Sequence, residues 1–294
     1  MKKVLLSAAI SATLALTALP SMAKDVDLRM SWWGGNGRHQ VTLKALEEFH
    51  KLNPDINVKA EYTGWDGHLS RLTTQIAGGT EPDVMQTNWN WLPIFSKNGE
   101  GFYDLNKMKD VIDLSQFDAK ELQSTTVDGK LNGIPISVTA RVFYFNDETW
   151  KKAGVEYPKT WDELMAAGKT FESKPWIQGE WAGTYMWNST INKYSDNLKP
   201  PAKLELGSYP MLPGATDAGL FFKPAQMLSI GKSTKNPEAA AKVINFLLNS
   251  KEGVETLGLE RGVPLSKVAV QNLTENGPNK EHQPAESALR LAQS

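Results

Sequence analysis

Cysteine does not occur in this chain of 294 residues. Its absence excludes disulfide bonds, thiolate-bound zinc, iron–sulfur clusters and catalytic thiols, because all of them need cysteine sulfur. A surplus of positive charge is also missing, since 32 lysines and arginines stand against 33 aspartates and glutamates. A chain with a formal charge of -1 lacks the basic surface that binds nucleic acid, so we expect no nucleic-acid partner.

The sequence also lacks the motifs of common enzymes and metal sites. Its four histidines show no short metal-ligand spacing, and no nucleophile elbow, Walker loop or dinucleotide-binding glycine motif occurs. Adjacent acids such as Glu47 and Glu48 point about 100° apart on a helix, so they cannot flank one glycosidic bond. We expect no catalytic residues, no metal and no cofactor. A glycosidase stays the alternative if folding brings acids such as Glu61 and Asp66 together.

A long apolar run lies at the amino terminus. Two lysines precede an apolar stretch from Val4 to Leu19, and Ser21-Met22-Ala23 supplies the small residues that a signal peptidase accepts. Hydroxyl residues dilute the stretch and Pro20 ends it, which disfavours a membrane anchor of about 20 apolar residues. We expect residues 1–23 to be a cleaved signal peptide and the mature protein to be periplasmic.

Strands and helices alternate along the first part of the mature chain. Apolar residues recur at every second position from Val26 to Trp32 and again from Ile56 to Tyr62, as they do on strands with one buried face. Between them, residues 39–52 follow the spacing of a helix that ends at Asn53-Pro54. This β-α-β order predicts an open α/β sheet of parallel strands, with a further short strand at 83–85. Ligands of such sheets bind beyond the carboxyl ends of the strands.

The second half of the chain continues this alternation. A long strand-like run from Ile136 to Phe145 is expected to cross between two lobes and form a hinge. Helix-opening signals follow at Thr160 and at Asn236.

Tryptophan is abundant, with ten residues, and none of them lies after Trp187. An indole offers a flat apolar face that stacks on the C–H face of a sugar ring, while nearby polar groups bond the sugar hydroxyls. Trp150 and Trp161 lie at helical spacing with other apolar residues, so we expect them in the core. Trp33, Trp65, Trp89 and Trp187 lie instead at predicted strand ends or beside turn residues, where loops are expected. They predict a sugar-binding site whose polar neighbours are Asn36, Arg38, His39, Asp66, Asn88, Asn90 and Asn188.

Several motifs resemble those of the family 1 extracellular sugar-binding proteins of ABC importers. They are the signal peptide, Trp32-Trp33-Gly34-Gly35, the helix end at 49–56, the stretch 78–84 and Asn132-Gly133-Ile134-Pro135. Trp-Trp-Gly-Gly followed by Arg38-His39, and residues 179–183 leading to Trp187-Asn188, are most similar to the periplasmic oligogalacturonide-binding branch. The resemblance covers most of residues 1–277. It implies an α/β fold of the periplasmic binding protein type, with two lobes joined by hinge strands, and ligand closure without chemistry.

The resemblance also implies a ligand and a partner. The ligand is expected to be a short acidic oligosaccharide, an oligogalacturonide from pectin, and the partner the membrane permease of an ABC importer, with the binding protein a monomer. Arg38, His39 and Arg141 suit this ligand, because a guanidinium pairs bidentately with a uronate carboxylate. The predicted ligand-binding residues are Trp33, Asn36, Arg38, His39, Trp65, Asp66, Asn88, Trp89, Asn90, Arg141, Trp187 and Asn188.

The chain departs from the family pattern in two places. Between Lys174 and Pro175 the family has a helical section of its second lobe that is absent here, and the match ends after Gly277. We therefore expect an incomplete second lobe. Two alternatives stay open: a secreted pectin-active lyase or hydrolase with the same aromatic site, and a truncated paralogue that binds nothing. The expected organisation is a signal peptide at 1–23, a first α/β lobe at 24–135, hinge strands with a shortened second lobe and return segments at 136–277, and a polar tail at 278–294.

Overall fold

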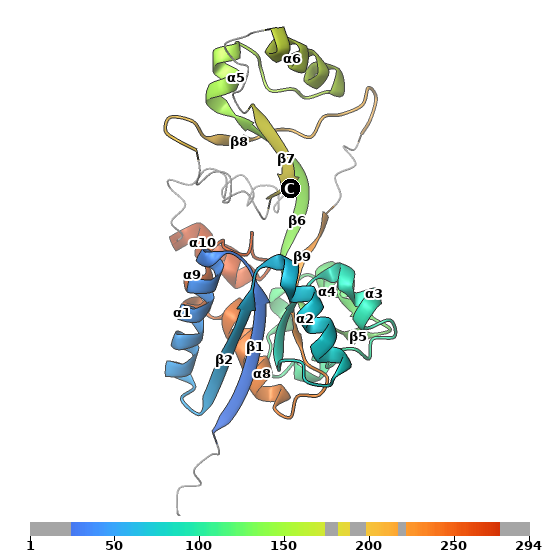
Figure 1. Ribbon diagram of the computed structural model, residues 1–294, viewed down its shortest axis with the longest axis vertical. Helices are drawn as coiled ribbons and strands as arrows, with labels where there is room; N and C mark the ends of the chain where they lie inside the picture. The colour runs from blue at the N-terminus through green and yellow to red at the C-terminus, as the bar shows by residue number, and fades with distance from the viewer. Residues whose placement is uncertain (1–24, 174–181, 189–197, 217–221, 277–294) are drawn as a thin grey trace, which may run out of the picture.

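The computed structural model describes residues 25–173, 182–188, 198–216 and 222–276. These residues form two lobes, one above the other in Figure 1, with long strands running between them. The predicted signal peptide at 1–23 and the polar tail at 278–294 lie outside the described residues. Within the described ranges, no helix has the length and apolar character needed to cross a bilayer.

The first lobe, at the bottom of Figure 1, is built on the predicted β-α-β unit. Strand β1 pairs in parallel with β2 over its full length, and β3 pairs with β1 in parallel on the other side. The main elements are β1 (Val26–Trp33), α1 (Asn36–Leu52), β2 (Ile56–Thr63), α2 (Trp65–Ala77), β3 (Val84–Thr87), α3 (Leu92–Phe95) and α4 (Ala119–Ser124). Short elements lie between and after them: the 3-10 helices η1 (Trp89–Trp91), η2 (Leu105–Met108) and η3 (Leu114–Gln116), and the hairpin of β4 (Thr126–Val127) and β5 (Lys130–Leu131).

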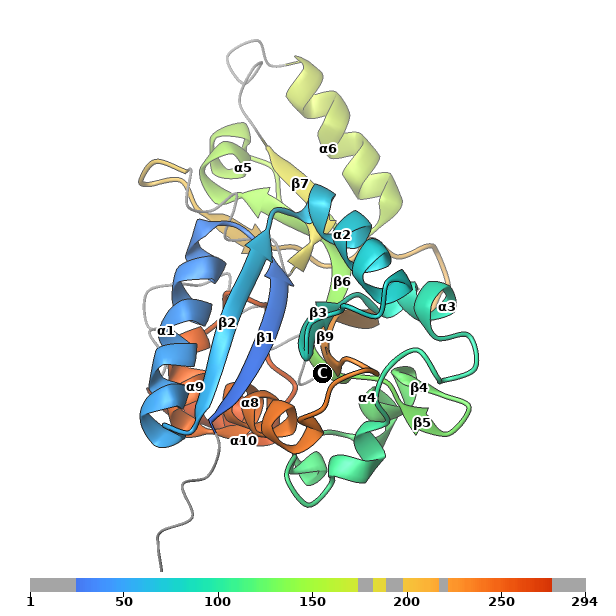
Figure 2. The same ribbon diagram turned by 60° about the horizontal axis from the view of Figure 1, so that its bottom comes forward.

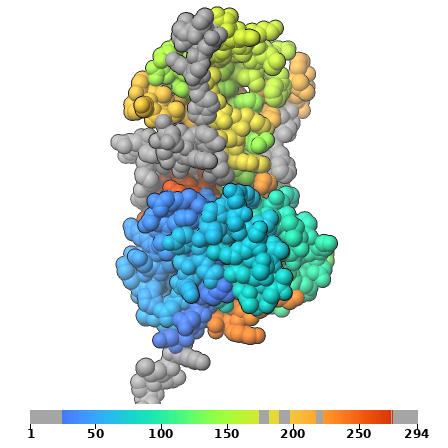
Figure 3. Space-filling view, in the orientation of Figure 1, coloured from blue at the N-terminus to red at the C-terminus, as the bar shows by residue number. Residues whose placement is uncertain are grey.

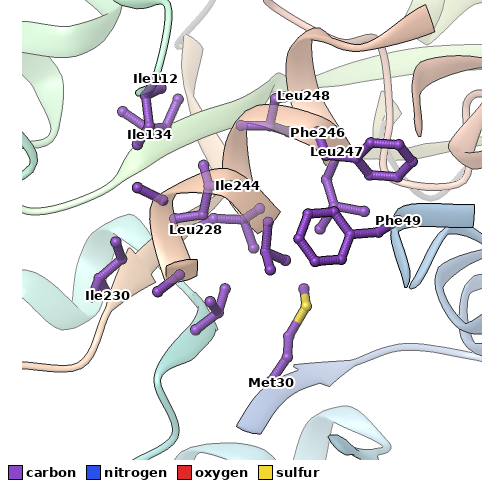
Figure 4. Close-up of a cluster of buried hydrophobic side chains, with 14 of the residues drawn as sticks. Met30, Phe49, Ile112, Ile134, Leu228, Ile230, Ile244, Phe246, Leu247 and Leu248 are labelled. Atoms are coloured by element: carbon purple, nitrogen blue, oxygen red, sulfur yellow. The ribbon is translucent and has the colours of Figure 1, made fainter. Parts of the chain in front are cut away.

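Two hydrophobic clusters cover the two faces of this sheet, with α1 on one side and α2 on the other (Figure 2). On the first face, Phe49 of α1 packs edge-on against Phe246 of α8 (Pro237–Asn249), with ring centroids 5.4 Å apart. Met30 of β1 lies beside them, as Figure 4 shows. On the second face, Leu72 of α2 packs in a cluster with Trp33 of β1. The alternation along β1 therefore supplies side chains to both cores.

Strand β6 (Ile134–Asn146) crosses between the lobes, as the sequence predicts for residues 136–145 (Figure 1). Its residues 134–140 pair antiparallel with β9 (Phe222–Ile230), and its residues 141–145 pair antiparallel with β7 (Gly183–Trp187). Because β9 also pairs with β3, one mixed sheet of order β2-β1-β3-β9-β6-β7 runs through both lobes. After β9 the chain completes the first lobe with α8, α9 (Lys251–Leu257) and α10 (Lys267–Asn276).

The second lobe is the smaller body in the space-filling view (Figure 3). It contains the second half of β6, α5 (Asp147–Ala153), α6 (Trp161–Ser173), β7 and β8 (Leu204–Leu206), which pairs with β6. Trp150 is 3% exposed and its indole N–H donates to the carbonyl of Ala182 at 2.8 Å, as expected of a core residue. Trp161 was expected in the core, but it is 37% exposed because it begins α6 and meets Phe143 only edge-on.

Candidate ligand-binding site

Four rings gather at the carboxyl ends of the parallel strands, and we call Trp33, Trp65, His68 and Trp91 the first-lobe aromatic cluster. Trp33 ends β1, Trp65 begins α2 just after β2, and Trp91 follows β3. The rings of Trp65 and Trp91 are stacked at 5.5 Å, and Trp33 meets Trp65 edge-on at 5.1 Å. Trp65 is 48% exposed, whereas Trp33 is 8% exposed. Trp65 therefore presents ring surface to solvent, and Trp33 supports it.

The predicted residues after β3 are held by hydrogen bonds. Asn88 is buried and caps η1, with its Oδ1 accepting from the backbone N–H of Asn90 at 3.5 Å. Trp89 is half-buried and its indole N–H donates to the carbonyl of Ser124 at 2.8 Å. Asn90 is exposed. The side-chain oxygen of Asn88 is occupied by this cap. The side-chain amide of Asn90 is therefore the more accessible of the two to a ligand.

Two predicted polar residues lie at helix starts on the first lobe. Asn36 and Asp66 are exposed in the first turns of α1 and α2.

Asp66 does not pair with Glu61, which accepts instead from Arg29 Nε at 2.6 Å and from Gln75 at 3.3 Å. Burial opposes ionisation of Glu61, but the hydrogen bond and charge of Arg29 outweigh it and lower the pKa of the Glu61 carboxyl. An ionised carboxylate held in this way is a poor general acid, so the geometry does not favour a glycosidase built on these two acids.

Arg38 and His39 occupy the first turn of α1. The Arg38 guanidinium donates to the carbonyl of Glu260 at 2.8 and 3.2 Å and to that of Trp33 at 3.3 Å, and burial lowers its pKa. His39 Nδ1 accepts from the indole N–H of Trp32 at 3.1 Å, and its ring lies 4.5 Å from that of Tyr62. Burial, and then the charges of two arginines, lower the pKa of His39. The neutral ring that accepts at Nδ1 carries its proton on Nε2, which makes that atom a donor.

Arg261 belongs to this region, although no sequence motif predicted a role for it. It is 4% exposed, and its guanidinium donates to Gln86 Oε1 and to Thr42 Oγ1, the latter at 2.8 Å. Its backbone carbonyl accepts from Ser137 Oγ at 2.6 Å and from Gln226 Nε2 at 2.8 Å. One residue thus connects α1, β3, β6 and β9 where the crossing strands leave the first lobe. The available signal was weak: a charged pair at 260–261 inside an otherwise apolar segment.

A second group lies on the crossing strands themselves, and we call Arg141, Trp187 and Lys223 the crossing-strand cluster. The Arg141 guanidinium carbon lies 5.5 Å from the centroid of the Trp187 ring, and Lys223 Nζ lies 4.9 Å from it. Arg141 and Trp187 were predicted, whereas Lys223 was not. Asn188 follows Trp187 but is buried, and its Oδ1 accepts from Thr139 Oγ1 at 2.9 Å. The side-chain oxygen of Asn188 therefore links the end of β7 to β6.

Aromatic rings continue from the crossing-strand cluster into the second lobe. Phe143 and Tyr185 face each other with centroids 4.7 Å apart, and the Tyr185 and Tyr209 hydroxyls lie 3.2 Å apart. Tyr185 is 41% exposed and Arg141 lies 5.4 Å from its ring. The second lobe therefore presents aromatic surface beside the cations.

Within the part of the chain that the structure describes, no salt bridge balances the positive charge of this region. Arg38, Arg141, Lys223 and Arg261 form no salt bridge with a carboxylate of the residues that the structure describes. The charge of Glu260 acts on Arg38 and Arg261 without forming a salt bridge with either. Among the described residues, no group of three acids or histidines could hold a metal ion. The arrangement suits an anionic ligand with apolar ring faces.

A groove of about 710 Å³ opens elsewhere on the first lobe. Leu28, His50 and Val58 are among its lining residues, which belong to the amino-terminal halves of β1 and β2 and to the end of α1. Ligands of parallel sheets bind at the opposite, carboxyl ends of the strands. None of the predicted ligand-binding residues lines this groove, so its size does not make it the candidate site.

Comparison with known proteins bears directly on this site. The sequence profile of the bacterial extracellular solute-binding proteins matches residues 38–188. The chain belongs to this family. This solute-binding protein is 60% identical to a periplasmic oligogalacturonide binding protein from Yersinia enterocolitica, solved in complex with saturated digalacturonic acid, with a TM-score of 0.83 over 92% of this chain and 86% of that one. It is 39% identical to a periplasmic solute binding protein from Pectobacterium atrosepticum, with a TM-score of 0.85 over 92% and 87% of the two chains.

Curated relatives match over smaller shares. A putative binding protein of Brucella abortus is 32% identical over 161 residues, which are 54% of this chain and 39% of the relative. The diacetylchitobiose binding protein DasA of Streptomyces coelicolor is 34% identical over 118 residues, which are 40% and 27% of the two chains. The solute-binding protein thus spans less than half of these two relatives. The predicted resemblance and the α/β fold of the periplasmic binding type are confirmed, and coverage of 86% of the Yersinia chain makes the predicted shortening mild.

Proposed function

We propose that this solute-binding protein captures short acidic oligosaccharides of the oligogalacturonide class and delivers them to the permease of an ABC importer. The observation that carries the proposal is the set of cations without a described counter-ion beside exposed aromatic rings. Aromatic faces suit the C–H faces of sugar rings, and guanidinium groups suit uronate carboxylates. The 60% identity to an oligogalacturonide binding protein supports the same ligand class.

Binding in this proposal uses both lobes. Trp65 offers a stacking face on the first lobe, while Arg141 and Trp187 lie where the crossing strands pass to the second lobe. Rotation of the lobes about β6 and β9 brings these groups together around the ligand and excludes water, which strengthens each ionic contact. Trp89, Arg38 and His39 line the first-lobe side, with the amino terminus of α1 adding partial positive charge. Asn36, Asp66 and Asn90 are exposed at the same strand ends and bond sugar hydroxyls.

The proposed setting is the periplasm. Residues 1–23 direct export and are cleaved, and the mature protein works as a monomer that meets its permease at the membrane. Membership of the bacterial extracellular solute-binding proteins supports this placement. No bond of the ligand is broken in this scheme. The ion pair between Glu61 and Arg29 agrees with it, because a carboxylate held in its ionised form is a poor general acid.

Isothermal titration calorimetry with digalacturonic acid and a neutral digalactoside tests the proposal. We expect binding of both sugars, with higher affinity for the acid, because only the acid can use the cations. Equal affinities would contradict the proposal that the ligand is acidic, but they would still support sugar binding. The absence of heat with either sugar would indicate a paralogue that no longer binds.

A product assay separates the proposal from the enzymatic alternative. The protein is incubated with a longer oligogalacturonide, and new reducing ends and unsaturated products are measured. We expect neither. Either product, formed in proportion to protein concentration, would identify a pectin-active hydrolase or lyase instead.

A further inference from the structure

Lys223 lies on the same face of the sheet as the predicted cation Arg141. In β6, Thr139 and Arg141 are two residues apart, so their side chains point to the same face. Lys223 of β9 is directly opposite Thr139, and Trp187 of β7 is directly opposite Arg141. Because directly opposed residues share a face, all four side chains emerge together. The β9-β6-β7 order puts Lys223 and Trp187 on either side of β6, and the lysine side chain reaches across β6 toward the indole.

The position of Lys223 is unfavourable for a lone cation. It is half-buried, its ammonium group lies 4.9 Å from the Trp187 centroid, and Arg141 lies 5.5 Å from the same ring. The indole face replaces only part of the hydration that a half-buried ammonium group loses. Burial lowers the pKa of Lys223, and no carboxylate of the described chain forms a salt bridge with it. A bound anion would compensate for this lost hydration.

From this geometry we propose that Lys223 and Arg141 together bind one uronate carboxylate beside Trp187, and that Lys223 is a specificity-determining residue. The inference rests on the proposed function and adds to it a residue and a selection rule. Arg141 is exposed and pairs with the carboxylate from the solvent side, while the half-buried Lys223 holds it from the strand side. The sugar ring of that uronate lies toward the exposed ring of Tyr185, next along the same face.

The selection rule concerns charge rather than shape. A galacturonide and its methyl ester have the same ring and the same hydroxyls, but the ester has no negative charge. Two cations facing a neutral ester gain little from it and still lose hydration, so the site selects the free acid. Lys223 contributes more to this selection than an exposed cation does, because a half-buried charge is less screened by salt and water.

The experiment compares four proteins by calorimetry, using digalacturonic acid and its dimethyl ester as probes. They are the wild type, Lys223→Met, Lys223→Arg and Lys59→Met. Methionine keeps an unbranched apolar stem and removes the charge, whereas arginine restores a cation. Lys59 is a matched control, because it is also a strand lysine but is exposed on β2, outside the predicted site. Thermal unfolding of each protein is recorded first, and Lys223→Gln takes the place of the methionine variant if that one does not fold.

We expect the wild type to prefer the acid and Lys223→Met to lose about tenfold or more of its affinity for the acid. Its affinity for the ester should change by less than about twofold, Lys223→Arg should keep most of the preference, and Lys59→Met should match the wild type. An equal loss for acid and ester in Lys223→Met, or no loss at all, overturns the inference and leaves the proposed function standing. A wild type that binds neither probe overturns both.

Discussion

The two lobes differ in what holds them together. In the first lobe, α1 and α8 come from opposite ends of the chain and bury one large core against β1 and β6. Among the residues of the second lobe that the structure describes, the buried side chains fall into two small clusters on the two faces of β6, one around Tyr144 and the other around Trp150. Burial of apolar surface is the main stabilising contribution to folding. The second lobe therefore depends on the strand that it shares with the first, and we expect the first lobe to be the more stable.

The largest expected effect comes from opening the first-lobe core. Phe49 is fully buried against Phe246, so Phe49→Ala should lower the free energy of unfolding of the first lobe by about 3 to 5 kcal/mol. Urea unfolding followed by tryptophan fluorescence and by circular dichroism measures this change. We expect two transitions in the wild type, with the second lobe unfolding at lower urea.

Trp150→Ala is the matched change in the second lobe, since Trp150 is 3% exposed. It should shift the low-urea transition and leave the other in place. A single cooperative transition that both variants shift equally would show that the shortened second lobe is complete in itself and unfolds together with the first.

The next effect is a dependence of first-lobe stability on pH. His68 is fully buried in the first-lobe aromatic cluster with Nε2 3.1 Å from the carbonyl of Gln86, and burial lowers its pKa to about 4 from the usual 6.5. The folded state therefore favours the neutral ring. This contribution is complete above pH 6.5 and is lost as the pH falls toward 4, which amounts to about 3 kcal/mol.

Unfolding free energies at pH 7 and pH 4 measure this loss for the wild type, His68→Gln and His50→Gln. Carboxylates add to the acid sensitivity of all three proteins, and the exposed His50 controls for the substitution itself. We expect the pH dependence to shrink only in His68→Gln. Equal dependence in all three would mean that His68 is protonated in the folded state at no extra cost.

Local patterns predicted much of the fold, and the reason is physical. The alternation in β1 and β2 and the long apolar run of β6 record burial on the sheet, which is a property of consecutive residues. Trp161 was misplaced, because helical spacing does not show which residue begins a helix and escapes the core.

The candidate site was only partly predictable. Strand ends marked Trp33 and Trp65 alike, although Trp33 packs in a buried cluster with Leu72 and Met85 while Trp65 is 48% exposed. Lys223 and Arg261 reach the site because β9 and the segment after α9 return to the crossing point, which no local pattern records. Contacts between segments far apart in the sequence therefore determine which of these residues reach the site, and local motifs do not show such contacts.

The next prediction separates binding from support within the first-lobe aromatic cluster. Trp65→Ala should weaken binding of digalacturonic acid by about 1 kcal/mol, the usual contribution of one aromatic contact, with little change in stability, since the ring is 48% exposed. Trp33→Ala should mainly destabilise the first lobe, because Trp33 is 8% exposed. Calorimetry and urea unfolding on both variants test this. Unchanged affinity in Trp65→Ala would place the ligand away from these strand ends.

The smallest effect is expected on the surface of the second lobe. Lys151 pairs with Asp147 one turn earlier in α5 at 2.6 Å, but its side chain is 73% exposed. Solvent screens such a pair and side-chain entropy opposes it, so Lys151→Ala should change the low-urea transition by no more than about 0.5 kcal/mol. Urea unfolding in low and high salt measures this, and the small difference should disappear in high salt. A loss above about 1 kcal/mol, beyond the usual range of an exposed pair, would mean that α5 relies on its surface charges. The contrast between the lobes would then rest on electrostatics as well as on the size of their cores.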